Sequence, residues 1–500
     1  MTDPSPAALD AAPATPSAGP ARHWLVAVVV VCLAQFMVVL DATITLVALP
    51  SIQTDLHFAP SDLQWVINAY MLAFGGFLLL GGRAGDLLGR RRLFLAGVGL
   101  FTFASLLDAT ATSPGFLIAA RALQGLGAAL VSPAALSIIT SSVPEGPDRA
   151  KALGAFAAIS GGGGAAGLLL GGILTDALSW QWVFLVNLPV GVAALALALR
   201  FVPESRIANR SGGFDLVGAV LVTAGLSLLT FAIVKAQDFG WGDVRTLGGA
   251  LGAVGLLALF GAVESRRAAP LVRLSIFRTR TLTTANGVTV LLVGGLYSLF
   301  FFGTLYFQQI KGYNALESGV AFLPQTIGII GGSVISQTLI MRFGPKAVLA
   351  GGLATAAAGL LWMTTLTPDG SYWTGFLPGL VLLALGMGNA FVPLTLIATS
   401  GVAPDDQGLA SGLFNTSQQI GGALGLAVLS TVASQASAGA HGSRAAVLTH
   451  GYTTAFGVGT ALLVAAAAVV VVALRRDDAA AVAVDEGVAV DDAEAMVAAA

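Results

Sequence analysis

Long apolar segments separated by short polar stretches occupy nearly the whole of this chain. A membrane-spanning helix needs about 20 apolar residues, and fourteen segments of roughly that length can be marked in the sequence. Of the 500 residues, 56% are hydrophobic and 10% are charged, whereas soluble domains carry about 25% charged residues. We therefore expect an all-α integral membrane protein with fourteen transmembrane helices. The segments are 24–49, 62–82, 93–110, 114–140, 151–174, 180–202, 213–235, 246–264, 285–310, 318–341, 347–366, 372–398, 411–436 and 453–474.

The positions of lysine and arginine predict the orientation in the membrane. With the amino terminus inside, the outer loops and their borders hold only Lys235, Arg245, Lys311 and Arg444, and nearly all other cations fall inside. Short loops rich in Lys and Arg remain in the cytoplasm. We expect a multi-pass protein of the plasma membrane with both termini cytoplasmic. No basic face remains for nucleic acid, and the net charge is −2.

An internal repeat divides the chain into two halves. Residues 147–156, PDRAKALGAF, resemble residues 405–414, DDQGLASGLF, and QGLGAALVSP at 124–133 has a counterpart in LGMGNAFVP at 385–393. The repeat pairs spans 1 to 6 with spans 9 to 14, and spans 7 and 8 are left as an insertion. Parallel repeats of six helices are found in one class of secondary transporters.

This organisation predicts six regions. They are a disordered cytoplasmic terminus at 1–21, an amino-terminal six-helix bundle at 22–202, two extra helices at 203–264, a basic cytoplasmic linker at 265–284, a carboxy-terminal six-helix bundle at 285–474, and a disordered acidic tail at 475–500.

One acid and one base lie deep within predicted spans. Asp41 is about 25 Å from the inner start of the first span, and Arg121 is about 10 Å from the outer end of the fourth span, which runs the opposite way. The two side chains therefore lie at similar depth. A carboxylate in hydrocarbon requires a partner, a watery cavity or a proton. We predict that Asp41 carries a proton with Arg121 as its partner; a static ion pair is the alternative. Asp108, near the end of the third span, is expected at the membrane interface.

A basic turn joins the second and third spans. Gly82, Asp86, Gly89, Arg90 and Arg91 match the loop pattern G-x-L-A-D-R-x-G-R-R/K of the major facilitator superfamily, although Leu87 replaces the Arg that follows the acid. The resemblance implies that this turn helps to stabilise the state that is closed on the inner side. A topology signal without further function is the alternative.

Further motifs resemble the fourteen-span drug/proton antiporters of the same superfamily. LDATITLVALP at 40–50 is similar to their first-helix motif, and RALQGLGAAL at 121–130 is similar to an element of their fourth helix. In the fifth span, Gly163, Gly167 and Gly171 recur every fourth residue and predict close helix packing. With Gly172 they resemble the motif G-x-x-x-G-P-x-x-G-G, except that Leu168 stands where proline is expected.

Uncharged polar and aromatic residues in the spans are candidates for a substrate cavity. An apolar, aromatic cavity with scattered amides suits hydrophobic or amphipathic organic molecules. Packing contacts between helices are the alternative role for each residue. The candidates are Gln124, Tyr297, Phe301, Gln308, Asn389, Asn415 and Gln418.

Together these features predict a monomeric secondary transporter, not an enzyme, that exports organic compounds in exchange for protons by alternating access. We expect no cofactor other than the proton gradient, and no metal site, since His23, His57, His441 and His450 all lie near or outside the membrane ends. An uptake or uncoupled carrier is the alternative within transport. A proton-pumping subunit of a respiratory complex would need several ionisable residues in mid-membrane, and a membrane glycosyltransferase would need a large soluble loop.

Overall fold

The computed structural model describes residues 23–144, 146–204, 215–267, 270–400, 402 and 406–474. Within these ranges the side chains of some helical residues, Asp86 among them, lie outside the description. All regular secondary structure in the described ranges is helical. The two segments expected to be disordered, residues 1–21 and 475–500, fall outside the described part of the chain.

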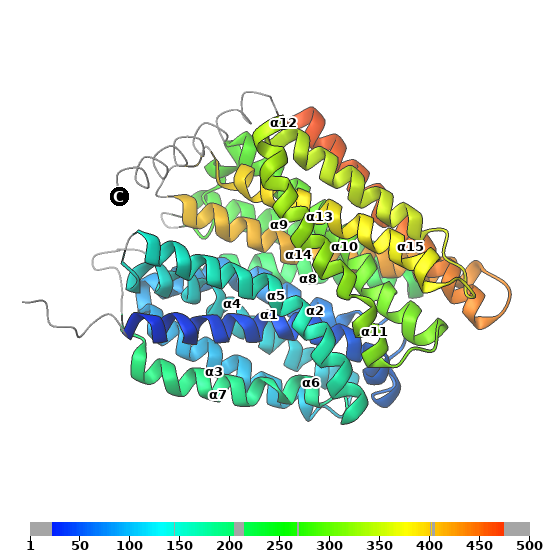
Figure 1. Cartoon of the computed structure of the whole chain (residues 1–500), viewed down its shortest axis with the longest axis horizontal. Coiled ribbons are helices and arrows are strands. Elements are labelled where there is room, and N and C mark those ends of the chain that lie inside the picture. Colours follow the sequence, from blue (N-terminus) through cyan, green and yellow to red (C-terminus); the bar gives the residue numbers. More distant parts are fainter. Residues whose placement is uncertain are drawn as a thin grey trace, which may run out of the picture.

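The first group of helices corresponds to the first six apolar segments and forms the lower half of the molecule in Figure 1. The sixth segment contains two helices in direct succession, separated by Val186, whose φ of −60° and ψ of −25° remain helical. The helices are α1 (His23–Asp55), α2 (Trp65–Leu88), α3 (Arg90–Ala109), α4 (Pro114–Ser142), α5 (Pro147–Ala177), α6 (Trp182–Leu185) and α7 (Asn187–Phe201).

Two further helices, α8 (Leu216–Phe239) and α9 (Val244–Arg266), follow the first group. α8 packs against α2 and α14, so the inserted helices cover one side of the junction between the two halves. After α9, a short helical turn, η1 (Leu274–Arg278), leads into the second group.

The second group forms the upper half in Figure 1. Its helices are α10 (Arg280–Leu305), η2 (Tyr306–Ile310), α11 (Ala315–Ala321), α12 (Leu323–Met363), η3 (Tyr372–Phe376), α13 (Leu377–Thr399), α14 (Gln407–Gly439) and α15 (Arg444–Ala473).

Twelve segments of the described residues are long and apolar enough to cross a membrane. One of them, Ala315–Met363, has 49 residues and changes direction at Gly344, whose φ of 78° and ψ of 159° are not helical. The predicted spans 318–341 and 347–366 lie on either side of this glycine. α5 has 31 residues but is not among these twelve segments, because its described apolar part, Ala166–Ala177, is shorter than a full span. The all-helical membrane architecture is confirmed, and the number fourteen stays a prediction.

The internal repeat falls on equivalent helices of the two groups. Its first pair of segments lies at the starts of α5 and α14, and its second pair lies in α4 and α13. α4 contains Pro133 and α13 contains Pro393 at matching positions inside the helix. Proline removes one backbone hydrogen bond and favours a bend, so we expect α4 and α13 to bend at equivalent positions of the repeat.

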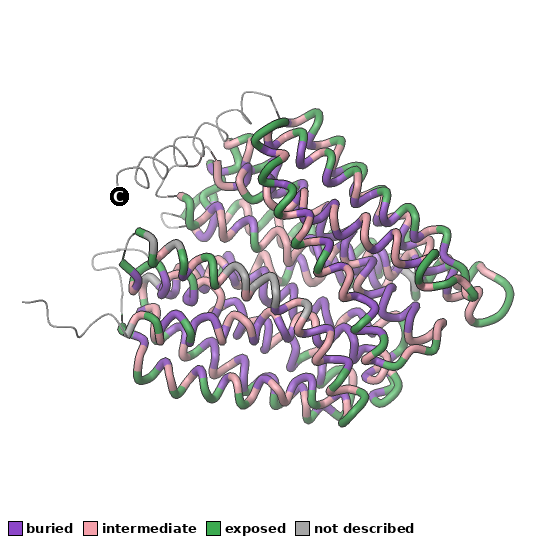
Figure 2. The backbone as a smooth tube through the Cα atoms, in the orientation of Figure 1, coloured by how far each residue is buried: buried purple, intermediate pink, exposed green. Residues whose placement is uncertain are grey.

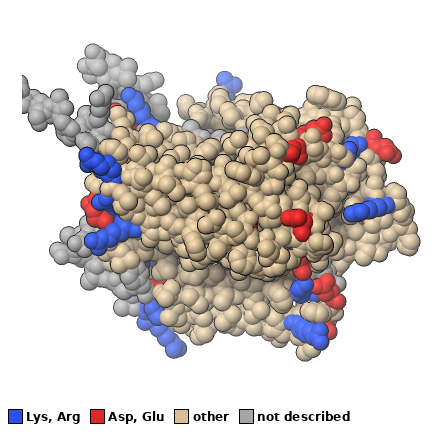
Figure 3. All heavy atoms as spheres, turned by 90° about the horizontal axis from the view of Figure 1, so that it is seen from below, with Lys and Arg blue, Asp and Glu red and all other residues tan. Residues whose placement is uncertain are grey.

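The surface of the molecule has the charge distribution of a membrane protein. In Figure 3, charged side chains gather toward the two ends, and lysines and arginines dominate the left end. A broad area between the ends carries few charges. Figure 2 shows that buried residues lie mostly along the inward faces of the helices. Large apolar residues such as Val244, Leu251 and Ile327 are 71–81% exposed, as expected for a surface that contacts lipid.

Glycines permit α1 and α5 to lie in close contact. A Cβ atom on Gly167 would lie 2.0 Å from Oγ1 of Thr43 and 2.8 Å from the carbonyl oxygen of Leu40, and one on Gly171 would lie 2.8 Å from the carbonyl oxygen of Ile44. Gly163 of α5 faces the side chain of Val39, which also belongs to α1. Gly172 contacts α11 instead, where a Cβ would lie 2.6 Å from the Cα of Leu316.

We expect Gly167→Ala to destabilise the first group of helices by about 1–3 kcal/mol, because the added methyl group overlaps the backbone of α1. The measurement is the thermal unfolding midpoint of the purified protein in detergent. Gly154→Ala is the matched control, since no atom lies within 4 Å of a Cβ at that position of the same helix. Equal midpoints for the two variants would contradict the packing argument.

Candidate functional site

Asp41 and Arg121 form an ion pair in the interior of the first group of helices. The distance between Nη1 of Arg121 and Oδ2 of Asp41 is 2.5 Å, and both side chains are completely buried. The residues come from the middle of α1 and from the second turn of α4. Because these helices run in opposite directions, their shared depth follows from the rise of about 1.5 Å per residue.

Amide and hydroxyl groups from three helices complete the surroundings of Asp41. Nε2 of Gln124 donates to Oδ1 of Asp41 at 2.8 Å, and Nδ2 of Asn187 donates to the same oxygen at 2.9 Å. Both amides also donate to Oγ of Ser105, at 2.8 Å and 3.3 Å. Oε1 of Gln124 accepts a bond from Nη1 of Arg121. The carboxylate thus receives three hydrogen bonds inside a region closed to solvent.

Arg121 is fixed by contacts with α2 and α6. Its Nε donates to the carbonyl oxygen of Val66 at 3.0 Å. The guanidinium carbon lies 4.5 Å from the centre of the Tyr70 ring and 5.6 Å from that of Phe184. A cation over an aromatic face is attracted to it, more strongly when water is absent. The ion pair is therefore held from six helices of the first group: α1, α2, α3, α4, α6 and α7.

The sequence did not single out two members of this arrangement. Ser105 and Asn187 were not selected, although each is a polar residue inside an apolar segment, which is the signal that could have identified them. Asp108, expected at the membrane interface, lies one residue before the end of α3, and its side chain is completely buried. Its depth in the membrane stays a prediction.

The basic turn contacts neighbouring segments. Gly89 separates α2 from α3 with a φ of 107°, a backbone conformation that favours glycine. Nη1 of Arg90 donates to the carbonyl oxygen of Ser137 at 3.4 Å, and Nη2 of Arg91 donates to that of Leu199. A Cβ on Gly82 would make only an ordinary contact with Pro133, and the side chain of Asp86 lies outside the described part.

Arg83, next to Gly82, reaches beyond the first group. Its Nη1 donates to the carbonyl oxygen of Pro270, in the segment between α9 and η1, at 2.6 Å. The same segment carries Arg273, whose guanidinium pairs with Asp406 just before α14. The linker is therefore bonded to both halves of the molecule at this end.

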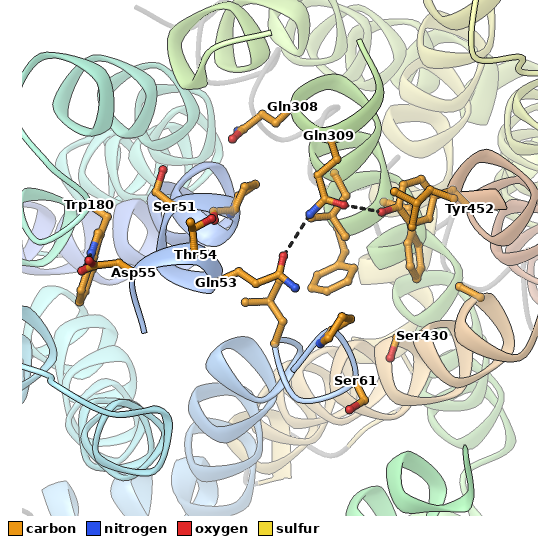
Figure 4. A pocket seen from close by; sticks show the side chains of 18 of the residues that line it. Ser51, Gln53, Thr54, Asp55, Ser61, Trp180, Gln308, Gln309, Ser430 and Tyr452 are labelled. Carbon is orange, nitrogen blue, oxygen red and sulfur yellow. Dashed lines mark hydrogen bonds between the residues drawn. The ribbon is translucent and has the colours of Figure 1, made fainter. Parts of the chain in front are cut away.

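A cavity of about 1280 Å³ opens at the opposite end, between the two groups of helices. Figure 4 shows amide and aromatic side chains from both groups around it. Nε2 of Gln309 donates to Oε1 of Gln53 at 3.0 Å, and the hydroxyl of Tyr452 donates to Oε1 of Gln309 at 3.0 Å (Figure 4). Nε2 of Gln308 donates to the carbonyl oxygen of Val47 at 2.9 Å. These bonds connect α1 with η2 and α15.

The cavity contains two of the seven sequence candidates, Phe301 and Gln308. Gln124 belongs to the buried site described above. Asn389 lies where α12 packs against α13, with Nδ2 bonded to the carbonyl oxygen of Leu385, and Asn415 is exposed and bonded to that of Ser411. Tyr297 packs against Gly422 of α14, and Gln418 is half-buried. A role in substrate binding stays a prediction for all seven.

No metal site is apparent in the part of the chain that the structure describes, because no three His, Cys, Asp or Glu side chains gather there at ligand spacing.

Comparison with known proteins finds relatives along most of the chain. It is 44% identical over 463 residues to the puromycin resistance protein pur8 of Streptomyces alboniger, covering 89% of this chain and 90% of that one. It is 43% identical over 443 residues to the cephamycin export protein CmcT of Amycolatopsis lactamdurans, covering 88% and 90%. The tetracenomycin C resistance and export protein of Streptomyces glaucescens is 37% identical, covering 83% and 77%.

Solved structures share the fold. A crystal structure of the nucleoside transporter NupG superposes with a TM-score of 0.65 at 11% identity, covering 91% of this chain and 100% of that one. An inward-facing, occupied bacterial homologue of the lysosomal transporter Spinster gives a TM-score of 0.61 at 18% identity, covering 89% and 96%. A sequence model of the Major Facilitator Superfamily matches residues 31–426. The chain therefore belongs to the Major Facilitator Superfamily and is a membrane transporter.

Proposed function

We propose that this protein exports hydrophobic or amphipathic organic compounds, antibiotics among them, in exchange for protons. The proposal of export is supported by relatives named for resistance to, or export of, puromycin, cephamycin and tetracenomycin C. In this proposal both termini face the cytoplasm, the cavity of Figure 4 faces outward, and the protein works as a monomer by alternating access between the two bundles.

The observation that carries the proton coupling is the buried Asp41–Arg121 pair. An ionised carboxylate inside a membrane is stable only with such partners. All three groups bonded to Asp41 are donors: Arg121, Gln124 and Asn187. A proton on Asp41 would remove the negative charge that attracts Arg121 and would weaken the acceptor oxygens, so these three bonds would become weaker.

Protonation therefore changes contacts between α1, α4 and α7. A bond network with two alternative arrangements gives a proton the means to shift a conformational equilibrium. The available driving force is about 2.3 kcal/mol per charge for each 100 mV of membrane potential, plus about 1.36 kcal/mol per pH unit. This is enough to drive export against a concentration gradient of more than tenfold.

The lining of the outward cavity supports a substrate with apolar and polar parts. Phe301, Phe302 and Tyr452 offer ring faces, and Gln53 and Gln308 offer amides. Asp55 accepts a bond from the indole nitrogen of Trp180 at 2.7 Å, so its charge is already engaged. Such a lining suits large amphipathic molecules more than small ions.

We expect Asp41→Asn to abolish proton-driven export while the protein remains in the membrane. The amide cannot carry a proton, and it leaves Arg121 without its anion. The measurement is puromycin and ethidium accumulation in efflux-deficient cells. The values are normalised to the amount of membrane-inserted protein, because an unpaired buried charge destabilises the fold by about 3–5 kcal/mol and can lower that amount. Asp369→Asn, on an exposed loop, is the control. Export by Asp41→Asn at the control level would contradict the assignment.

Asp176 links the two bundles at the outer end. Its carboxylate oxygens accept bonds from the backbone nitrogens of Ala315 at 3.1 Å and Leu316 at 2.8 Å, at the start of α11. A negative charge at a helix amino terminus is stabilising, so Asp176→Asn is expected to favour opening of the outer side.

This expectation can be measured by thiol labelling. Ser430 lines the outer cavity with its hydroxyl buried, and the only native cysteine, Cys32, is itself buried. In a Ser430→Cys background, Asp176→Asn should increase the labelling rate by a membrane-impermeant maleimide several-fold, whereas Asp369→Asn should leave it unchanged. An unaltered rate in Asp176→Asn would show that this contact does not restrain opening.

A further inference from the structure

A second buried carboxylate lies beside the Asp41–Arg121 pair. The Asp108 side chain is completely buried, and neither of its oxygens has a hydrogen-bond partner among the described residues. An isolated ionised carboxylate in such surroundings is strongly unfavourable, and the usual outcome is that the group takes up a proton. The hydrogen bonds of the described residues therefore give Asp108 no structural role.

The position of Asp108 connects it to the same network. It follows Ser105 by three residues on α3 and so shares that residue's helix face. Ser105 accepts bonds from Gln124 and Asn187, the two amides that hold Asp41. Asp108 is also close enough to interact electrostatically with both Arg121 and Asp41.

Arg121 has capacity for another partner. Its Nε and Nη1 are bonded to Val66, Asp41 and Gln124, but its buried Nη2 has no hydrogen-bond partner in the described part of the chain. A guanidinium has five donors in a fixed fork and can hold two acceptors in different directions. One cation thus interacts electrostatically with two carboxylates and has one unused nitrogen.

The charges allow only one of the two acids to be ionised at low cost. Asp41, Asp108 and Arg121 are the charged or ionisable groups here, together with two phenols that stay neutral, that of Tyr70 beside the guanidinium and that of Tyr297 from α10. With Asp41 paired to Arg121, a proton on Asp108 makes the group neutral. If the proton is on Asp41 instead, neutrality requires that Asp108 be ionised and that Arg121 pair with it.

We propose that Asp108 is a proton relay that loads Asp41 from the outer side of the membrane. Asp108 lies one residue before the end of α3, near exposed Thr110, at what the proposed orientation makes the outer end. The proton leaves Asp108 and is taken up by Asp41, while Arg121 turns its free nitrogen to Asp108. Asp41 then releases the proton inward, Arg121 returns to Asp41, and Asp108 takes a new proton from outside. One proton crosses per cycle.

This inference rests on the proposed coupling role of Asp41, and infrared difference spectroscopy of the purified protein at neutral pH tests it directly. The difference spectrum obtained by subtracting Asp108→Asn from the wild type should contain the carbonyl band of a protonated carboxyl group. In the Asp41→Asn background, Arg121 is free to pair with Asp108, so the same subtraction should contain no such band. Asp369→Asn, which alters an exposed acid, should leave both results unchanged.

Absence of the band in the wild type, or its persistence in the Asp41→Asn background, would overturn the relay. The second outcome would mean that Asp108 keeps a proton regardless of Arg121. Size-exclusion profiles of each variant establish that the protein is folded, and Asp108→Glu, which retains a carboxyl group, should restore the band.

A transport measurement distinguishes a failure of this inference from a failure of the proposed function. Proteoliposomes loaded with a pH-sensitive dye report proton entry when puromycin is exported. If the wild type moves no protons with puromycin, the proposed coupling fails, and the relay fails with it. If the wild type and Asp108→Glu couple protons but Asp108→Asn does not, the relay is supported. Equal coupling by wild type and Asp108→Asn would leave Asp41 as the proton carrier and remove Asp108 from the mechanism.

Discussion

The ion pair between Asp41 and Arg121 is the interaction on which the interior of the first group of helices depends. Each charge would be unstable in this interior by itself, since taking an ion out of water costs several kcal/mol even after relaxation. The pair is stabilised by Gln124 and Asn187, which donate to the carboxylate, and by the carbonyl oxygen of Val66, which accepts from Arg121. Together with the pair itself, these groups come from four helices, α1, α2, α4 and α7, so a change in the charge state acts on several helices at once.

The two ends of the molecule are closed by different kinds of contact. At the end with the basic turn, Arg83 and Arg273 connect the linker to α2 and to the start of α14 through exposed or partly exposed cations. At the other end, Gln53, Gln309 and Tyr452 connect the two groups of helices through neutral hydrogen bonds, and the Asp176 carboxylate accepts bonds from the start of α11. Neutral bonds and screened surface charges are each worth about 1 kcal/mol. Neither end is held strongly, which suits a protein that must open at both.

The sequence predicted the depth of the ion pair correctly because depth depends only on helix rise and direction, which one sequence supplies. Burial of a side chain near a helix end depends on which neighbours cover that face, and so the sequence did not reveal that Asp108 is buried. The cavity candidates show the same limit. Asn389 and Asn415 donate to the carbonyl oxygen four residues earlier in their own helices, and composition alone does not distinguish such amides from Gln308, which bonds across the bundles.

Helix α1 provides the physical connection between the buried pair and the outer cavity. Asp41 lies about 9 Å along the helix axis from Val47, whose carbonyl oxygen accepts the bond from Gln308. Pro50 follows within the same helix, and because proline lacks a backbone donor it weakens the helix at that point. Gln53 and Asp55, beyond the proline, form part of the cavity wall. In the proposed coupling, a shift of α1 caused by a proton on Asp41 would reach the cavity through this one helix, which is weakened at Pro50.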